Sequence, residues 1–182
     1  MKTMADHILD ICQNSIRAKA TLIEIMMEEE KNSDLYKIII KDNGRGMDKQ
    51  VQKQATDPFF TTRKTRKVGL GLALLKQNAE LSGGSFQLKS EPGKGTVVEA
   101  VFGFSHIDRL PSGDMADTFL LLMNANKGNF ILNYKTGKGA YNISSSEIND
   151  SVGEGMCKHK EIRKAILQLI NNNLEEIEAS IN

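Results

Sequence analysis

The sequence predicts an α/β fold followed by a small α+β extension at the C-terminus. Apolar residues recur every three or four positions in several stretches of ten or more residues, which indicates amphipathic helices. Between these stretches lie short runs rich in β-branched and apolar residues, which favour strands. The sequence pattern changes after a connector over 104–111. We therefore expect a first domain over 1–103 and a small C-terminal extension over 104–182 that packs on it.

The first predicted helix covers residues 5–19 and has two distinct faces. One face carries Asp10, Asn14 and Arg17, because the spacing i, i+4 and i+7 brings them onto one side of a helix. Such a polar face most often points to solvent, so it predicts no chemistry by itself. The buried face is expected to comprise Ile8, Ile11, Cys12, Ser15 and Ile16.

Two β-branched segments follow and are predicted as strands joined by a polar hairpin loop. A short helix, a basic loop and a longer helix come next, and the glycines at 83 and 84 are a stop signal for that helix. Two further strands flank a turn at 92–95. In order, the expected ranges are 21–29 and 35–41 (strands), 48–55 (helix), 61–68 (loop), 70–81 (helix), and 86–89 and 96–102 (strands).

The C-terminal extension is predicted to contain a helix over 114–126, a hairpin formed by 129–136 and 140–144, and a last helix over 157–181. The last helix has a long apolar stripe, which must be buried. We expect the stripe to dock within the chain, and the alternative is a contact with a partner or a homodimer through this helix. The stripe consists of Ile162, Ile166, Leu169, Ile170, Leu174, Ile177 and Ile181.

Composition and charge exclude several classes of protein. The 182 residues include 24 Lys plus Arg and 23 Asp plus Glu, a net charge of +1, which argues against a broad basic surface for nucleic acid. Cys12 and Cys157 are too few for a disulfide scaffold or a four-cysteine zinc site. The N-terminal residues lack the apolar run of a signal peptide, and no stretch reaches the ~20 apolar residues of a membrane span. We therefore expect a cytoplasmic protein with no nucleic-acid or membrane partner.

The segment Asp42-Asn43-Gly44-Arg45-Gly46-Met47 directly follows a predicted strand. Asn and Gly tolerate the left-handed backbone of a tight turn, and glycines let the main chain approach a flat ligand closely. An Asp at such a turn can accept a hydrogen bond from an exocyclic amine such as that of adenine. A plain turn at the end of a strand would have the same pattern, so this motif alone leaves both interpretations open.

Two neighbouring segments have the chemistry that binds polyphosphate. The loop with Thr61-Thr62-Arg63-Lys64 combines hydroxyls with cations, which favours charge-assisted hydrogen bonds to phosphate, although a solvated charge run is the alternative. Gly69-Leu70-Gly71-Leu72 leads directly into a predicted helix, whose first N–H groups and dipole attract phosphate oxygens. It matches neither the P-loop nor the dinucleotide-binding fingerprint.

Three single side chains complete the candidate set. Asn14 offers an amide oxygen that suits Mg²⁺ beside substrate phosphates. Asp10, one helical turn earlier, can orient or deprotonate a water molecule. Thr96 ends the turn Gly93-Lys94-Gly95-Thr96, where its hydroxyl can face a ligand or simply close the turn.

In this order and spacing, the motifs resemble the sequence boxes of the GHKL ATPases. That superfamily includes gyrase, heat-shock chaperones, histidine kinases and the mismatch-repair ATPases. The resemblance covers about residues 5–103. It implies a GHKL-type α/β sandwich, a mixed sheet with helices on one face. The segment Phe59-Phe60-Thr61-Thr62-Arg63 is similar to the histidine-kinase branch, and the chain resembles its stand-alone anti-sigma-type kinases.

The resemblance also implies roles for individual residues. Asn14 is implied as the ligand of Mg²⁺, and Asp42 as the acceptor of the adenine amine. Asp10 stands at the implied catalytic position, where the hydrolysing branches have Glu and kinases often have Asn. Gly69 and Gly71, together with Arg63 and Lys64, are implied to hold the phosphates. The full implied ATP-binding set is Asn14, Asp42, Gly44, Gly46, Met47, Thr61, Thr62, Arg63, Lys64, Gly69, Leu70, Gly71, Leu72 and Thr96.

We therefore expect an ATP- and Mg²⁺-binding protein that phosphorylates a separate, unidentified protein partner. Because only nine residues precede Asp10 in this sequence, we expect no helical pair with the acceptor His of histidine kinases of this kind. We likewise expect no transducer domain of the gyrase and mismatch-repair types after Gly103. The alternative is a nucleotide-dependent binding switch that regulates a protein partner and hydrolyses ATP slowly or not at all.

Overall fold

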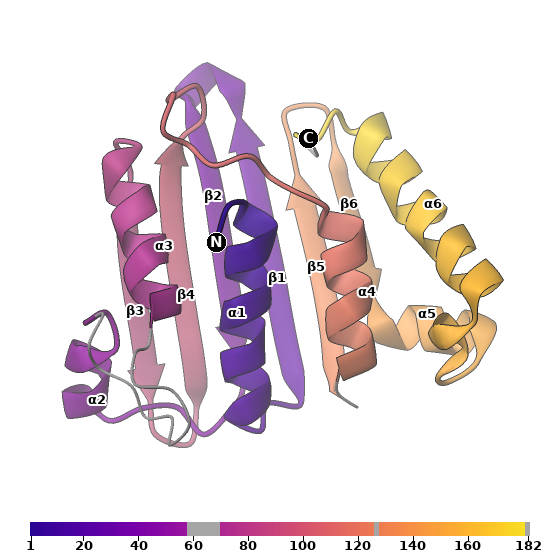
Figure 1. The fold of residues 1–182 in the computed structure, drawn as a ribbon, viewed down its shortest axis with the longest axis horizontal. Helices are drawn as coiled ribbons and strands as arrows, with labels where there is room; N and C mark the ends of the chain where they lie inside the picture. The colour runs from indigo at the N-terminus through magenta and orange to yellow at the C-terminus, as the bar shows by residue number, and fades with distance from the viewer. Residues whose placement is uncertain (58–69, 126–127, 181–182) are drawn as a thin grey trace.

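The computed structural model describes residues 1–57, 70–125 and 128–180, which form one mixed sheet of six strands in the order β3-β4-β2-β1-β5-β6. Figure 1 shows α1, α3 and α4 on one face of this sheet, with α6 beside α4. The predicted α/β fold is thereby confirmed. The elements are α1 (Met4–Arg17), β1 (Leu22–Glu30), β2 (Leu35–Asp42), α2 (Lys49–Gln54), α3 (Leu70–Leu81), β3 (Ser85–Glu91), β4 (Gly95–Gly103), α4 (Met115–Ala125), β5 (Asn129–Lys135), β6 (Ala140–Ser144), α5 (Ser145–Val152) and α6 (Lys160–Glu176).

Helix α1 begins at a capping box. The Thr3 hydroxyl accepts a hydrogen bond from the Asp6 backbone N–H, and the Asp6 carboxylate accepts one from the Thr3 N–H. The Lys2 backbone N–H also donates to this carboxylate, and this bond first, with the one from the Thr3 N–H, holds the pKa of Asp6 below its ordinary value. The helix then buries its apolar face against the sheet, as the spacing of the sequence predicts.

The central strand β1 pairs antiparallel with β2 and parallel with β5. Ile25 therefore lies opposite Ile40 on one side and Leu132 on the other, and all three are buried beneath the helices. Because side chains alternate along a strand, Met26 points to the other face, as do Glu24 and Glu28 two positions before and after it. These three side chains are half-buried. The C-terminal residues thus continue the same sheet.

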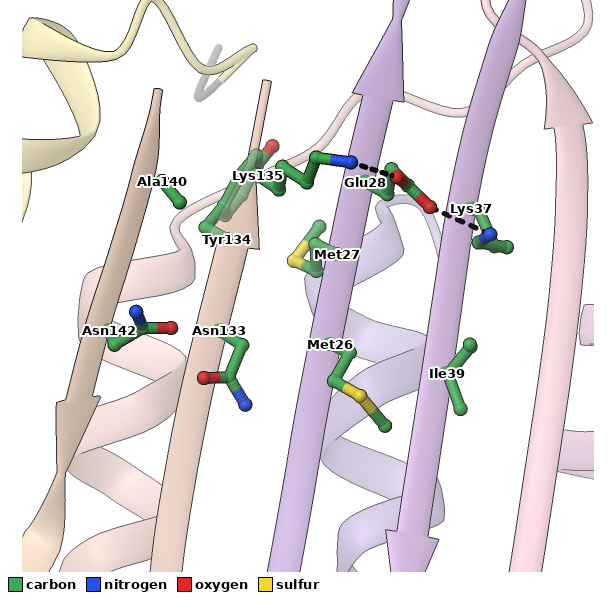
Figure 2. A pocket seen from close by; sticks show the side chains of 10 residues that line it. All are labelled: Met26, Met27, Glu28, Lys37, Ile39, Asn133, Tyr134, Lys135, Ala140 and Asn142. Carbon is green, nitrogen blue, oxygen red and sulfur yellow. Dashed lines mark hydrogen bonds and ion pairs between the residues drawn. The ribbon is translucent and has the colours of Figure 1, made fainter. Parts of the chain in front are cut away.

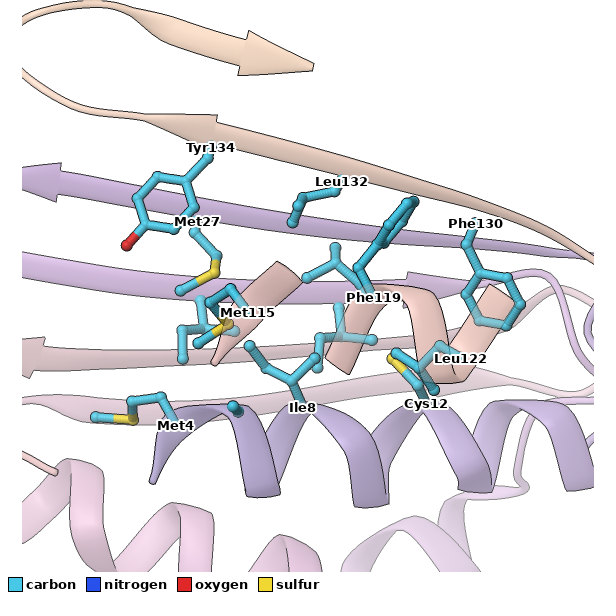
Figure 3. Packing of buried hydrophobic residues seen from close by; sticks show 14 of the residues in the cluster. Met4, Ile8, Cys12, Met27, Met115, Phe119, Leu122, Phe130, Leu132 and Tyr134 are labelled. Atoms are coloured by element: carbon cyan, nitrogen blue, oxygen red, sulfur yellow. The ribbon is translucent and has the colours of Figure 1, made fainter. Parts of the chain in front are cut away.

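The C-terminal residues also share one hydrophobic core with the rest of the chain. Helix α4 and strand β5 contribute large aromatic and aliphatic side chains that meet the buried faces of α1 and β1 (Figure 3). The predicted boundary after residue 103 falls at the start of the connector between β4 and α4, and it stays a prediction. The residues that meet in this part of the core include Ile8, Cys12, Met27, Met115, Phe119, Leu122, Phe130 and Leu132.

The prediction was wrong at the end of the chain in two respects. Residues 145–152 form a helix, α5, that the sequence did not suggest, and the Ser144–Glu147 capping box initiates it. The last helix is shorter than the predicted 157–181, because residues 156–158 form a separate 3-10 turn, His159 is extended before the helix, and Glu178 adopts left-handed backbone after it. Its apolar stripe is docked within the chain as expected: Ile166, Ile170, Leu174 and Ile177 are buried, whereas Leu169 is 52% exposed.

Candidate functional site

Asp42 is the last residue of β2, and its carboxylate is held on both oxygens. Oδ2 accepts a hydrogen bond from the Ser15 hydroxyl of α1 at 2.6 Å, and Oδ1 accepts one from the Gly44 backbone N–H at 2.8 Å. The residue is only 8% exposed. Burial and, second, the Asp42 carboxylate raise the pKa of the neighbouring Cys12 thiol, so that thiol stays protonated.

The turn after Asp42 is joined to the turn between α1 and β1. The side-chain oxygen of Asn43 accepts hydrogen bonds from the backbone N–H groups of Thr21 and Leu22, at 2.8 and 2.9 Å. The Arg45 N–H donates to the Ala18 carbonyl at 3.0 Å. Asp42 therefore lies in a segment whose position relative to α1 is fixed by backbone and side-chain bonds.

Two glycines let the same turn lie against the β3–β4 hairpin. Gly46 has a φ of +66°, and a Cβ there would lie 1.9 Å from the Glu91 carbonyl oxygen. Gly95 has a φ of +105°, and a Cβ there would lie 1.9 Å from the Asp42 carbonyl oxygen. Only glycine combines this backbone with so close an approach. Of the Asn and Gly residues in this segment, Gly46 has the left-handed backbone that the motif predicts, whereas Asn43 and Gly44 do not.

Ser90 of β3 connects the turn to Thr96. Its hydroxyl accepts a hydrogen bond from the Met47 backbone N–H at 2.8 Å, and it lies 2.9 Å from the Thr96 hydroxyl. Thr96 is the direct partner of Asp42 in the β2–β4 register. Asp42, Gly44, Gly46, Met47 and Thr96 therefore form one cluster, as the sequence predicts.

Helix α1 places a cation beside the expected Mg²⁺ ligand. Asn14 is half-buried, and its Oδ1 accepts a hydrogen bond from the Arg17 guanidinium. The arrangement puts an amide oxygen and a guanidinium on the turn of α1 that also holds Ser15, the partner of Asp42.

Asp10 lies against the first turn of α3. A Cβ on Gly71 would lie 1.9 Å from Asp10 Oδ2, so the carboxylate occupies the space that a side chain would need. Leu70 is 47% exposed and Leu72 packs against the core. The structure therefore brings the predicted catalytic carboxylate to the N-terminal turn of the predicted phosphate-binding helix. Thr61, Thr62, Arg63, Lys64 and Gly69 lie outside the described residues.

Two hollows differ in their relation to this site. One of about 440 Å³ borders Asp42, Ser90 and Thr96. Another of about 300 Å³ lies on the sheet face away from the helices, where Glu28 forms ion pairs with Lys37 and Lys135 (Figure 2). None of the predicted site residues that the structure describes lines the second hollow.

Ser15 and Ser90 are the site residues that the sequence did not single out. Ser15 falls on the buried face of the first helix, where a small polar residue is compatible with packing. Ser90 faces the helices from a strand in which alternate residues are exposed. Both serines carry a hydroxyl at a position that faces the core next to a motif. That combination is the sequence signal that could have identified them.

Comparison with known proteins agrees with this geometry. The model of the family described as histidine kinase-, DNA gyrase B- and HSP90-like ATPase matches residues 3–106. A putative sensor protein of Shewanella frigidimarina is 34% identical over 103 residues, which are 56% of this chain and 16% of that protein. The signal transduction histidine-protein kinase AtoS of Escherichia coli is 38% identical over 91 residues, 50% of this chain and 15% of AtoS. The chain thus spans about a sixth of the length of these curated relatives.

A solved structure shows the same fold at low sequence identity. The N-terminal domain of a DNA repair protein superposes with a TM-score of 0.55 at 16% identity, over 87% of this chain and 59% of that one. Among the described residues, no helix is both long and apolar enough to span a bilayer. Because the family model matches more than half of its residues, the chain belongs to the histidine kinase-, DNA gyrase B- and HSP90-like ATPase family.

Proposed function

We propose that the chain binds ATP with Mg²⁺ at this site and transfers the γ-phosphoryl group to a separate protein partner. The observation on which the proposal chiefly rests is the fixed Asp42 carboxylate, with Thr96 beside it in register. Each carboxylate oxygen can accept more than one hydrogen bond. Asp42 therefore retains the capacity to accept the adenine amine while Ser15 and Gly44 hold it in place.

The chemistry around α1 and α3 fits the phosphates. Helix α3 has twelve residues, and its first N–H groups and dipole favour anions next to Gly71. Arg17 adds a cation on α1. The Thr96 hydroxyl, on the residue opposite Asp42 in the β2–β4 register, can line the base.

The donor set fits a magnesium ion that arrives with the nucleotide. No group of three or more His, Cys, Asp or Glu side chains in the described ranges could hold a metal ion. Mg²⁺ at nucleotide sites keeps several waters and needs only one or two protein oxygens besides the phosphates. Asn14 Oδ1 is such an oxygen, and it has a second lone pair besides the one that accepts from the Arg17 guanidinium. When bound, the ion would neutralise phosphate charge.

Replacement of Asn14 by Ala is expected to remove the tightening of ATP binding by Mg²⁺, because the ion loses its protein oxygen. Adenosine binding should change little, because Asp42 and Ser15 are untouched. Titration calorimetry of ATP with and without Mg²⁺, and of adenosine, measures both effects. Gln13→Ala, an exposed neighbour on the same helix, is the matched control. An Asn14→Ala protein that binds Mg·ATP like the parent would contradict the assignment.

Asp10 favours transfer to a partner over hydrolysis in isolation. Phosphoryl transfer needs a nucleophile in line with the γ-phosphate, and most of the catalysis is positioning and charge stabilisation. Asp is one methylene shorter than the Glu that holds a water in hydrolysing relatives. A kinase takes its nucleophile from the partner, so Asp10 need only polarise that group or position the waters of the metal.

Phosphate release from the isolated protein is accordingly expected to be slow and to fall little further in Asp10→Asn. With radiolabelled ATP and cell extract, label should appear on another protein. Rapid turnover that collapses in Asp10→Asn would identify an ATPase instead. Intact ATP binding with no label on any protein would favour the alternative, a nucleotide-dependent binding switch.

A further inference from the structure

A polar pair, a buried histidine and a half-buried asparagine, joins α1 and α3. His7 of α1 is only 1% exposed, and its Nε2 lies 3.0 Å from the side-chain nitrogen of Asn78 on α3. The rest of the buried face of α1 is apolar, with Ser15 as the exception. A histidine in this place is therefore a departure from the packing that the helix uses elsewhere.

The His7 ring is uncharged at neutral pH. Burial lowers the pKa of His7 to about 4, and the chain's N-terminal amine adds to this, outweighing the carboxylates of Asp6 and Asp10. With the Asn78 amide oriented as it is, its N–H donates to Nε2, which leaves the ring proton on Nδ1. That atom is buried without a hydrogen-bond partner among the described residues. Two apolar side chains would avoid this unsatisfied donor, so maximal stability does not account for the pair.

Helix α3 contacts β3 and β4 as well as α1. Its buried residues are Ala73, Leu75 and Ala79, and two of these three are small. The contact at the first turn joins Gly71, which has no side chain, to Asp10. Contacts between small apolar side chains prefer no particular direction, whereas a hydrogen bond has a preferred distance and direction.

We infer that His7 and Asn78 are positioning residues that set the register of α3 on α1. His7 lies one turn before Asp10, and Asn78 lies two turns beyond Gly71, so their bond fixes the two helices that meet at the phosphate end of the site. A buried polar group that specifies register is an attested use of such groups. This inference rests on the proposed function, because the register matters only if Asp10, Asn14 and the first turn of α3 hold a triphosphate together.

The test compares Mg·ATP and adenosine binding in the double variant His7→Leu with Asn78→Leu. In this variant both helices stay docked on the sheet, α1 through β1 and β2 and α3 through β3 and β4, so only the register between the two helices is released. We expect Mg·ATP to bind at least about tenfold more weakly, since charge-assisted bonds to the phosphates are misaligned. Adenosine affinity and melting temperature should be retained, because removing both polar partners together is close to neutral for stability.

Two further variants keep the result specific. His7→Gln retains a side-chain acceptor for Asn78 and should restore most of the Mg·ATP affinity. Ser112→Ala removes another buried side-chain contact, 3.3 Å to the Tyr36 hydroxyl, and should leave Mg·ATP binding unchanged. Unchanged Mg·ATP affinity in the double variant would overturn the inference alone. A joint loss of stability and of both affinities would also overturn it, in favour of a structural role. A parent protein that binds no Mg·ATP would overturn the proposed function and this inference together.

Discussion

Replacement of Asp42 by Ala is expected to lower the affinity for ATP by a factor of at least about 100, in a protein that stays folded. The variant removes the carboxylate that would accept the adenine amine, and hydrogen bonds to charged groups contribute about 1.5–3 kcal/mol. It also leaves the Ser15 hydroxyl and the Gly44 N–H without the partner that they have in the parent. For the same reason the parent should strongly prefer ATP to GTP, whose carbonyl would face the buried acceptor.

Titration calorimetry with both nucleotides measures these effects, and circular dichroism verifies that the variant is folded. Asp108→Ala, which removes an exposed carboxylate at the other end of the sheet, is the control and should bind like the parent. Equal affinity for ATP and GTP, or unchanged binding by Asp42→Ala, would show that the base does not bind at Asp42.

Local motifs identified residues that the structure brings close together, and their role in binding stays a prediction. The left-handed backbone at Gly46 agrees with the Gly-rich motif. Asn43 instead acts through side-chain hydrogen bonds to Thr21 and Leu22 that a local pattern does not predict. Asp10 and Gly71 are separated in sequence, and their contact follows from the way α3 packs on α1. Ser15 could not be assigned a role, because a helical pattern says which face is buried but not which strand end that face meets.

The fold was predictable at the level of elements but not of pairing. Strand β5 is recognisable from its residues, yet its parallel pairing with β1 joins positions about a hundred residues apart. Nothing in a local pattern decides between a separate hairpin and a continued sheet. Helix α5 was missed because Ile148 and Val152 are its only large apolar residues, too few to produce a periodic signal.

Removal of residues 104–182 is expected to unfold the remainder of the chain. Without β5, strand β1 becomes an unpaired edge, and such edges promote aggregation. Without α4 and β5, Ile8, Cys12 and Met27 lose the cover of Phe119, Leu122 and Phe130. Truncating a single large core side chain typically costs about 2–5 kcal/mol, and a whole domain is stable by only about 5–15 kcal/mol. Losing several such side chains at once therefore exceeds the stability available.

The expected result is that residues 1–103 alone are insoluble or lack a cooperative thermal transition, whereas the full chain unfolds in one step by circular dichroism. The full-length control Leu169→Ala, which shortens a half-exposed side chain on α6, should melt close to the parent. A soluble 1–103 fragment that unfolds cooperatively and binds Mg·ATP would show the opposite, that the boundary after residue 103 separates an autonomous domain. In that case β5 and β6 would be additions to a finished sheet. The shared core of α1, β1, α4 and β5 argues instead that the proposed nucleotide site needs the C-terminal residues to hold α1 in place.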